Sequence, residues 1–201
     1  MPIKMDKNIK LSIVIPIHDM KGGADFLWAS INALMDQSFQ DFEIVITKAG
    51  KMAENTNAGI KRARGELIKV LYLDDRLAYK DALKDIVEAM EGKEWLITGC
   101  STNFSPHYTD NIETGNNKLG SPSCLTMRNN KPLLFDEKMS WLLDCDLYKR
   151  MYEKYGAPVI LEGEHVVMGI GNHQMTNILT DEEKKGEYIY LKTKNDNRNL
   201  S

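Results

Sequence analysis

Residues 11–17 read Leu-Ser-Ile-Val-Ile-Pro-Ile, a β-branched apolar run that is too short for a helix. Apolar side chains at nearly every position predict a strand that is covered on both faces, as strands of parallel sheets are. Residues 24–36 then repeat apolar side chains at helical spacing, and residues 42–47 (Phe-Glu-Ile-Val-Ile-Thr) again read as a strand. The chain is therefore predicted to begin with a strand–helix–strand unit.

The same alternation continues through the first hundred residues. Residues 55–64 predict a weaker helix closed by Gly65, and residues 67–73 predict a third strand. An amphipathic helix over 83–90 and a fourth strand over 94–100 follow. Regular alternation of strands and helices is typical of an α/β fold with a mostly parallel, Rossmann-like sheet flanked by helices.

Beyond residue 100 the pattern changes, which predicts a smaller mixed part. Residues 101–122 are rich in Asn, Thr, Gly, Ser and Pro, and such a long segment is expected to be functional or mobile. The elements predicted after it are two short strands (123–128 and 133–135), a helix (about 137–155) and a mixed segment (159–179). We expect the charged tail over 181–201 to be loosely held.

Composition narrows the class of protein. The 201 residues fit a single domain, and 42% hydrophobic with 27% charged residues is typical of a globular protein. A net charge of −3 argues against nucleic acid as a partner. No apolar run is long enough to cross a bilayer, and the start has no signal-peptide pattern, so we expect a cytoplasmic protein. The three widely spaced cysteines, Cys100, Cys124 and Cys145, suit buried reduced thiols.

Polar residues follow the predicted strands at the edge where an open parallel sheet binds ligands. Two adjacent carboxylates, Asp74 and Asp75, come directly after the third strand. Such a concentration of negative charge suits Mg²⁺ or Mn²⁺, which usually bridge to substrate phosphates. The alternative is that the pair forms a turn and caps the following helix.

Five segments of the sequence occur in an order that is typical of one enzyme family: residues 11–19, 37–44, 57–68, 73–75 and 143–147. Over about residues 10–180 the chain resembles an inverting family 2 glycosyltransferase of the GT-A fold. The resemblance implies a nucleotide-diphosphate sugar donor, with a UDP-sugar favoured, and Mn²⁺ or Mg²⁺ as the cofactor. It also implies a saccharide or other acceptor with a free hydroxyl, and a single domain over 1–180 with a nucleotide-binding half (1–100) and an acceptor half (101–180).

The resemblance also implies roles for individual residues. The nucleotide-sugar site would contain Pro16, Ile17, His18, Asp19, Asn57, Arg62 and Asp74. Asp74 and Asp75 match the metal motif, with Asp75 as the preferred ligand, and Asp144 matches the base that deprotonates the acceptor. His173, in a glycine-rich segment, would contact the metal or the diphosphate, although it could equally be a surface-loop histidine. We expect His107 and His165 to be structural or exposed.

Helix geometry independently favours Asp144 over Asp146 as the base. Residues two apart on a helix point about 200° away from each other, so only one of them can face a cleft. Asp144 shares a stripe with Leu147, Tyr148 and Met151, whereas Asp146 can pair with Arg150 at i+4. Burial raises the pKa of a carboxyl and makes it a better proton acceptor. The alternative is that both acids lie on a solvated helix surface.

Two departures from the family pattern leave other functions open. Thr47-Lys48-Ala49 stands where an acidic pair usually reads the nucleoside, and Tyr72 stands where the metal motif usually has another Asp. Fewer carboxylates weaken cation binding. A catalytically silent nucleotide-sugar binding module is therefore one alternative. A sugar nucleotidyltransferase is another, because Lys21-Gly22-Gly23 follows the first strand.

Overall fold

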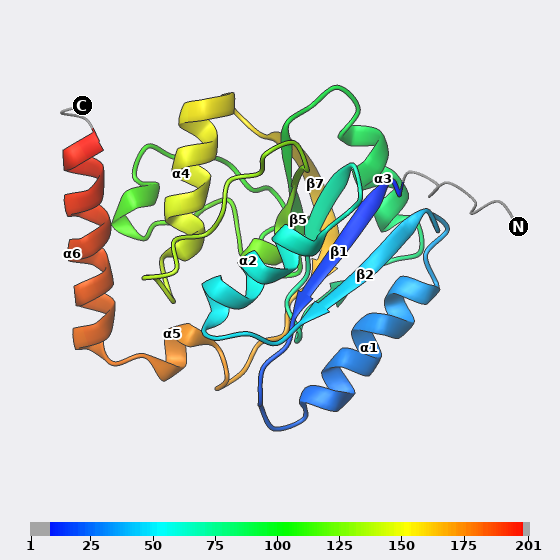
Figure 1. Cartoon of the computed structure of the whole chain (residues 1–201), viewed down its shortest axis with the longest axis horizontal. Helices are drawn as coiled ribbons and strands as arrows, with labels where there is room; N and C mark the ends of the chain where they lie inside the picture. Colours follow the sequence, from blue (N-terminus) through cyan, green and yellow to red (C-terminus); the bar gives the residue numbers. More distant parts are fainter. Residues whose placement is uncertain (1–8, 199–201) are drawn as a thin grey trace, which may run out of the picture.

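The computed structural model describes residues 9–198, which form a seven-stranded sheet with flanking helices (Figure 1). The strands are β1 (Leu11–Pro16), β2 (Phe42–Thr47), β3 (Leu67–Val70), β4 (Arg76–Leu77), β5 (Trp95–Cys100), β6 (Leu125–Arg128) and β7 (Val159–Val167). The helices are α1 (Gly23–Met35), α2 (Met52–Arg62), α3 (Ala82–Ala89), α4 (Leu143–Tyr155), α5 (Met175–Ile178) and α6 (Asp181–Arg198). Two 3-10 turns, η1 (Ile112–Thr114) and η2 (Pro122–Cys124), lie between β5 and β6.

The sheet is mostly parallel, as the sequence predicts. Its strand order is β2-β1-β3-β6-β5-β7-β4. β1 pairs in parallel with β2 and β3, and β5 pairs in parallel with β7. β6 runs antiparallel to both of its neighbours, and the short β4 runs antiparallel to β7. Five strands therefore run in one direction and two in the other, which confirms the predicted α/β class.

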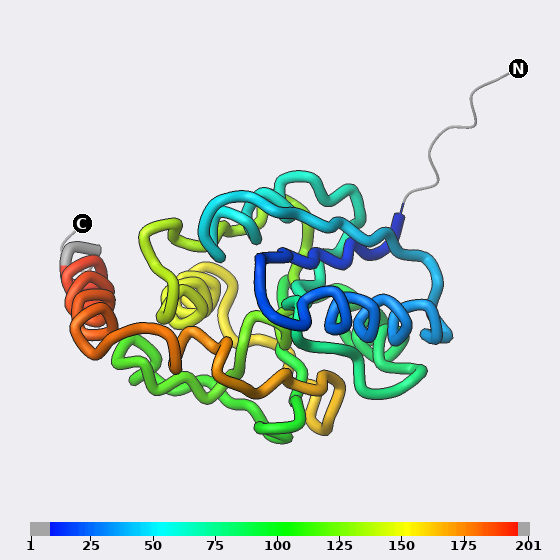
Figure 2. Tube along the Cα trace, turned by 90° about the horizontal axis from the view of Figure 1, so that it is seen from below, coloured from blue at the N-terminus to red at the C-terminus, as the bar shows by residue number. Residues whose placement is uncertain are grey.

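Helices cover both faces of the sheet, and this explains why the first strand is apolar at nearly every position. Figure 2 shows α2 on one side of β1 and α1 on the other. All six residues of β1 are buried. α2 packs closely because Gly59 faces Val14; a Cβ at this glycine would lie 2.3 Å from a Val14 methyl carbon. Among the described residues, none of the helices has the length and hydrophobicity needed to cross a membrane.

Several predicted boundaries differ from the structure for identifiable reasons. β3 ends at Val70, three residues early, because the chain then turns toward the two aspartates. Residues 133–135 form no strand; the Phe135 backbone instead exchanges hydrogen bonds with the Asn57 side chain. The helix predicted from about residue 137 begins only at Leu143. Gly65 does not close α2, whose C-cap is Ala63.

Over residues 181–198 the charged tail is not loosely held, contrary to the prediction, and residues 199–201 lie outside the described residues. Residues 181–198 form α6, which lies beside α4 at the end of the molecule far from β2 (Figure 1). Leu191 on this helix is fully buried, and Lys194 forms ion pairs with Asp136 at 2.5 Å and Asp146 at 2.7 Å. An apolar anchor and a shared cation therefore dock the tail onto the domain.

Candidate active site

A cavity of about 860 Å³ opens beyond the ends of β1 and β3 and extends to the start of α4. Five of the residues that the sequence singled out line it: His18, Asp74, Asp75, Asp144 and His173. They come from the loop after β1, the turn after β3, the first turn of α4 and the loop before α5. The fold thus brings together acidic and imidazole groups that are up to 155 residues apart in the chain, from His18 to His173.

Asp144 lies in the first turn of α4, where its carboxylate is held by two donors. Asn117 Nδ2 donates to one oxygen at 2.7 Å, and the Cys145 backbone N–H donates to the other at 2.8 Å. Burial raises the pKa of Asp144 to about 6, and these hydrogen bonds oppose that rise. A carboxylate with this pKa is ionised at neutral pH and is a stronger base than an exposed one.

Asn117, which the sequence analysis missed, fixes the orientation of Asp144. Its second amide hydrogen donates to the Gly120 carbonyl oxygen at 2.8 Å, and its own oxygen accepts the N–H groups of Leu119 and Gly120. The amide therefore has a partner at every donor and acceptor position and cannot flip freely. The Asn-rich composition of the loop was the only sequence signal for this role.

Asp74 and His173 form a second polar centre in the cavity. His173 Nε2 lies 2.8 Å from an Asp74 carboxylate oxygen, and Phe26 packs against the imidazole ring at 5.6 Å between centroids. Gly169 allows the two segments to approach, because a Cβ at this position would lie 2.4 Å from the Asp74 carbonyl oxygen. The aspartate and histidine are thus held together by close packing of the backbone.

Asp75 points away from this pair although it is adjacent in sequence. Its side chain is 3% exposed and accepts the Gly169 backbone N–H at 2.8 Å. Burial, and then the charge of Asp74, raise the pKa of Asp75 to about 7. Lys69 is also fully buried nearby; its amino group donates to the Ser123 carbonyl oxygen, and burial lowers its pKa to about 8. Asp75 therefore has the environment of a residue that stabilises the turn.

A divalent metal fits one part of this arrangement. A carboxylate oxygen and an imidazole nitrogen suit Mn²⁺ well, and Asp74 and His173 offer both at the cavity wall. Residues 9–198 contain no group of three or more His, Cys, Asp or Glu placed to hold a metal. Two protein ligands would leave coordination positions for substrate oxygens, as is usual for Mg²⁺-type sites. Asp75 is 3% exposed, whereas the Asp74 side chain is 16% exposed and lies beside the His173 imidazole, so Asp74 is the better placed of the two aspartates.

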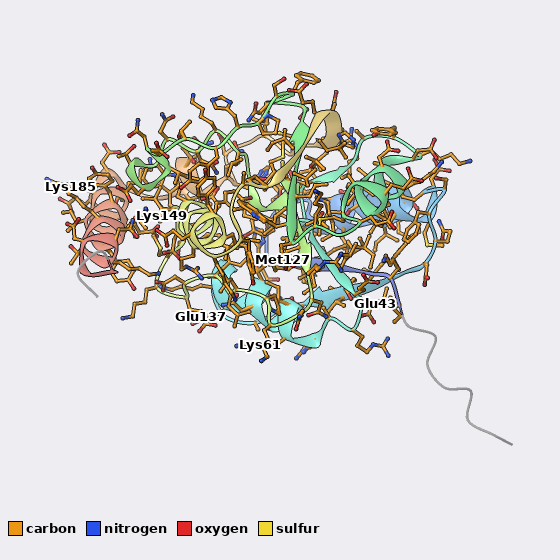
Figure 3. The ribbon with its side chains drawn as sticks, turned by 90° about the horizontal axis from the view of Figure 1, so that it is seen from above. Glu43, Lys61, Met127, Glu137, Lys149 and Lys185 are labelled. Carbon is orange, nitrogen blue, oxygen red and sulfur yellow. The ribbon has the colours of Figure 1, made fainter. Side chains whose placement is uncertain are left out.

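The other predicted nucleotide-site residues do not line the cavity. Pro16 and Ile17 form the end of β1 and the start of its loop, and Asp19 is exposed and paired with Lys48 at 2.7 Å. Asn57 is 1% exposed, and its amide is engaged with Phe135 and Glu137. Figure 3 shows Glu137 beside Lys61, with which it forms an ion pair at 4.0 Å. Arg62 is exposed at the end of α2 and is not part of the cavity wall.

Asn55, in the first turn of α2, is the asparagine of this helix that lines the cavity, whereas Asn57 does not. Asn55 donates to the Ile17 carbonyl oxygen at 2.8 Å and accepts the Ala49 N–H at 3.0 Å. These bonds connect the loops that follow β1 and β2. The choice between the two asparagines depends on which face of α2 meets the sheet, and the sequence did not specify that face.

Asp146 is on a different face of α4 from Asp144, as the helix geometry predicts, but it is not solvated. It is fully buried and forms ion pairs with Arg150 at 2.5 Å and with Lys194 of α6 at 2.7 Å. His165 is 5% exposed, whereas His107 is exposed. The three cysteines are buried and form no disulfide.

Comparison with known proteins places the fold. No protein-family model and no curated protein sequence matches the chain. The crystal structure of S. aureus TarS 1-349 in complex with UDP-GlcNAc is similar, with a TM-score of 0.70 and 17% identity over 90% of this chain and 65% of that one. The complex of TarS 1-349 with UDP gives a TM-score of 0.65 and 17% identity over 81% of this chain and 61% of that one.

A second glycosyltransferase has the same architecture. The mannosyltransferase PcManGT from Pyrobaculum calidifontis, in complex with GDP-Man and Mn²⁺, gives a TM-score of 0.58 and 10% identity over 86% of this chain and 61% of that one. The chain thus spans 61 to 65% of the length of these three chains. At such low identities the likeness establishes the fold, which is the GT-A-like α/β fold of these glycosyltransferases.

Proposed function

We propose that this protein is an inverting glycosyltransferase that moves a sugar from a nucleotide-diphosphate sugar, with a UDP-sugar favoured, to an acceptor hydroxyl. The observation that carries the proposal is the shared cavity: Asp144, with a pKa of about 6, lies in the same cavity as the Asp74–His173 pair. One centre is suited to take a proton and the other to hold a cation. The fold supports the proposal, because its solved neighbours bind UDP, UDP-GlcNAc or GDP-Man.

The proposed reaction is a single in-line displacement. The acceptor oxygen forms a bond to the anomeric carbon while the bond from that carbon to the diphosphate oxygen breaks. Asp144 accepts the proton of the acceptor hydroxyl, and the electron pair of the broken bond leaves with the nucleoside diphosphate. Attack from the face opposite the leaving group inverts the configuration. Bound at Asp74 and His173, Mn²⁺ or Mg²⁺ would neutralise the charge of the leaving diphosphate.

The predicted nucleotide-site residues differ in how close they lie to the cavity. His18 lines the cavity, whereas Pro16, Ile17 and Asp19 could contribute only through the loop that follows β1. Asn55 holds that loop against the one after β2, so it would shape the nucleoside pocket. Lys48 beside Asp19 replaces the usual acidic pair, and nothing in this arrangement selects one nucleobase. The preference for a UDP-sugar therefore rests on the resemblance alone.

The proposal is tested by separating donor binding from transfer. A thermal-shift panel of UDP-, GDP-, dTDP- and CMP-sugars, with and without Mn²⁺, identifies the donor because ligand binding raises the apparent melting temperature. The Asp144→Asn variant should keep this donor shift and lose transfer by about 10² to 10⁴-fold, the usual contribution of a general base. Transfer at the wild-type rate in that variant would refute the base assignment. A wild-type protein that binds a nucleotide sugar but never releases the nucleoside diphosphate would instead indicate a silent binding module.

A further inference from the structure

Trp141 lies just before α4 and lines the cavity. Hydrogen bonds fix both its backbone and its indole ring. The Glu187 carboxylate on α6 accepts three consecutive backbone N–H groups, those of Ser140 at 2.7 Å, Trp141 at 2.8 Å and Leu142 at 2.9 Å. The indole N–H donates to the Thr176 hydroxyl at 3.2 Å. Such a ring loses little conformational entropy when a ligand binds to it.

What Trp141 can offer a ligand is therefore its ring surface. Its only polar group, the indole N–H, is already bonded to Thr176. Lys184 lies over the ring at 5.9 Å from its centroid, and it does not line the cavity, whereas Trp141 does. Trp141 also precedes the proposed base, Asp144, by only three residues.

The surroundings of Trp141 combine apolar surface with a few polar groups. Met175, Ile178 and Leu179 continue the apolar wall, and Asn117 and Ser121 supply polar groups elsewhere in the same cavity. An apolar platform with a few oriented polar groups is the usual composition of a specific small-molecule site. A sugar ring has matching chemistry, since its C–H faces are apolar and its hydroxyl groups lie around the rim.

The charges near Trp141 favour a neutral ligand. The cavity lining has five carboxylates, among them Asp144, Glu183 and Glu187, and two lysines, Lys51 and Lys138, so negative groups are in excess. Hydrogen bonds from the Thr180 backbone and hydroxyl hold the pKa of Glu183 below its usual value. Glu187 also lines the cavity, and its carboxylate accepts the backbone N–H groups of Ser140 and Trp141. An acceptor bearing phosphate or carboxylate groups would be repelled by these carboxylates.

We propose that Trp141 is the stacking platform of the acceptor site and that the acceptor is a neutral saccharide. A sugar ring lies on the exposed part of the indole and presents a hydroxyl to Asp144. This inference rests on the proposed function, because it assigns the acceptor class for the same reaction. Glu187 and Thr176 act as positioning residues for the platform.

The test separates acceptor recognition from donor recognition. The probes are neutral disaccharides (maltose, cellobiose, lactose and N,N′-diacetylchitobiose), added to the full chain with Mn²⁺ and the donor or its nucleoside diphosphate. We expect at least one of them to change tryptophan emission in the wild type and in Trp28→Phe, but not in Trp141→Phe. Trp28 is a matched control because it is 67% exposed on α1 and does not line the cavity.

Kinetics provide the second measurement. Trp141→Ala should raise the acceptor KM at least tenfold and by a much larger factor than the donor KM, and Trp141→Phe should recover most of the acceptor affinity because it keeps an aromatic face. Unchanged acceptor KM in Trp141→Ala overturns the proposal, as does an equal loss of donor affinity. If the wild type binds a nucleotide sugar but no disaccharide, the acceptor proposal alone fails. If it binds no nucleotide sugar, the proposed function fails with it.

Discussion

Replacing Asn117 by Ala should change the pH dependence of transfer more than its maximal rate. The Asn117 side chain donates a hydrogen bond to the Asp144 carboxylate at 2.7 Å, which favours the charged form of Asp144. A hydrogen bond to a charged group contributes about 1.5–3 kcal/mol, and each pKa unit corresponds to about 1.4 kcal/mol. The variant should therefore raise the pKa of Asp144 from about 6 by about one to two pH units.

The sign of the effect follows from the role of Asp144 as a base. Transfer requires the ionised carboxylate, so activity falls as the pH drops through the pKa of Asp144, and a higher pKa moves this acid limb upward. At pH 6 the ionised fraction should fall about 5- to 50-fold in the variant, whereas at pH 9 the two proteins should have similar rates. The measurement is kcat/KM for transfer between pH 5 and 9.

A matched control distinguishes this effect from damage to the loop. Asn103 lies in the same segment and donates one hydrogen bond to the Lys118 carbonyl oxygen at 2.8 Å, but it has no contact with Asp144 in the structure. Asn103→Ala should leave the acid limb at the wild-type pH. A uniform loss of activity at all pH values in Asn117→Ala, or an unmoved acid limb, would refute the reasoning.

Five further substitutions, one of them a control, test three other parts of the structure. Asp74→Asn and His173→Ala should each reduce the extra thermal stabilisation that Mn²⁺ gives to the donor complex. In the wild type, a chelator should abolish this extra stabilisation. An unchanged Mn²⁺ effect in both variants would exclude the pair as ligands. Gly169→Ala should destabilise the fold by about 1–3 kcal/mol in urea unfolding and weaken the Mn²⁺ effect as well, because the new Cβ collides with the Asp74 backbone. Leu191→Ala should cost about 2–5 kcal/mol of unfolding free energy, whereas Ile189→Ala, 53% exposed on the same helix, should change it by less than about 0.5 kcal/mol; equal effects would show that α6 is not docked as described.

The first half of the fold could be predicted from the sequence because its signals are local. The apolar runs of β1 and β2 and the helical spacing between them identify a parallel unit without knowledge of the rest of the chain. The position of β6 could not be predicted in this way. It inserts antiparallel between β3 and β5, and that pairing depends on contacts between segments about 30 to 60 residues apart. Local propensity carries no information about such partners.

The helical tail was missed because its inner face is mostly polar. Lys184, Glu187, Tyr188 and Leu191 recur at i, i+3, i+4 and i+7, which is the spacing of one helix face. Of these four, only Leu191 is fully buried; Tyr188 is partly buried against the core, Glu187 accepts hydrogen bonds and Lys184 lies over the Trp141 ring. A pattern search that scores hydrophobic residues alone therefore finds a charged tail.

The residues of the candidate site that directly follow strands could be predicted from the sequence. Those that loop hydrogen bonds hold in place could not. The strand-end rule found His18, Asp74 and Asp75, and helix geometry found the inward face of Asp144. Asn117 was not predicted, because its hydrogen bond to Asp144 depends on how the loop folds. The two residues are 27 positions apart in the sequence. Nothing in a run of asparagines indicates which one will meet a carboxylate.

The two adjacent aspartates have different environments although their side chains are identical. Both carboxylates line the cavity, but Asp75 is 3% exposed and is bonded by the protein, whereas the Asp74 side chain is 16% exposed. Asp75 is buried against the Gly169 N–H near the buried Lys69, whereas Asp74 meets His173 at the cavity wall. The buried half of the pair thereby ties the glycine-rich segment to the end of β3. Because His173 belongs to that segment, the tie that Asp75 makes also holds the imidazole opposite Asp74. Asp75 would thus be needed for metal binding without being a ligand.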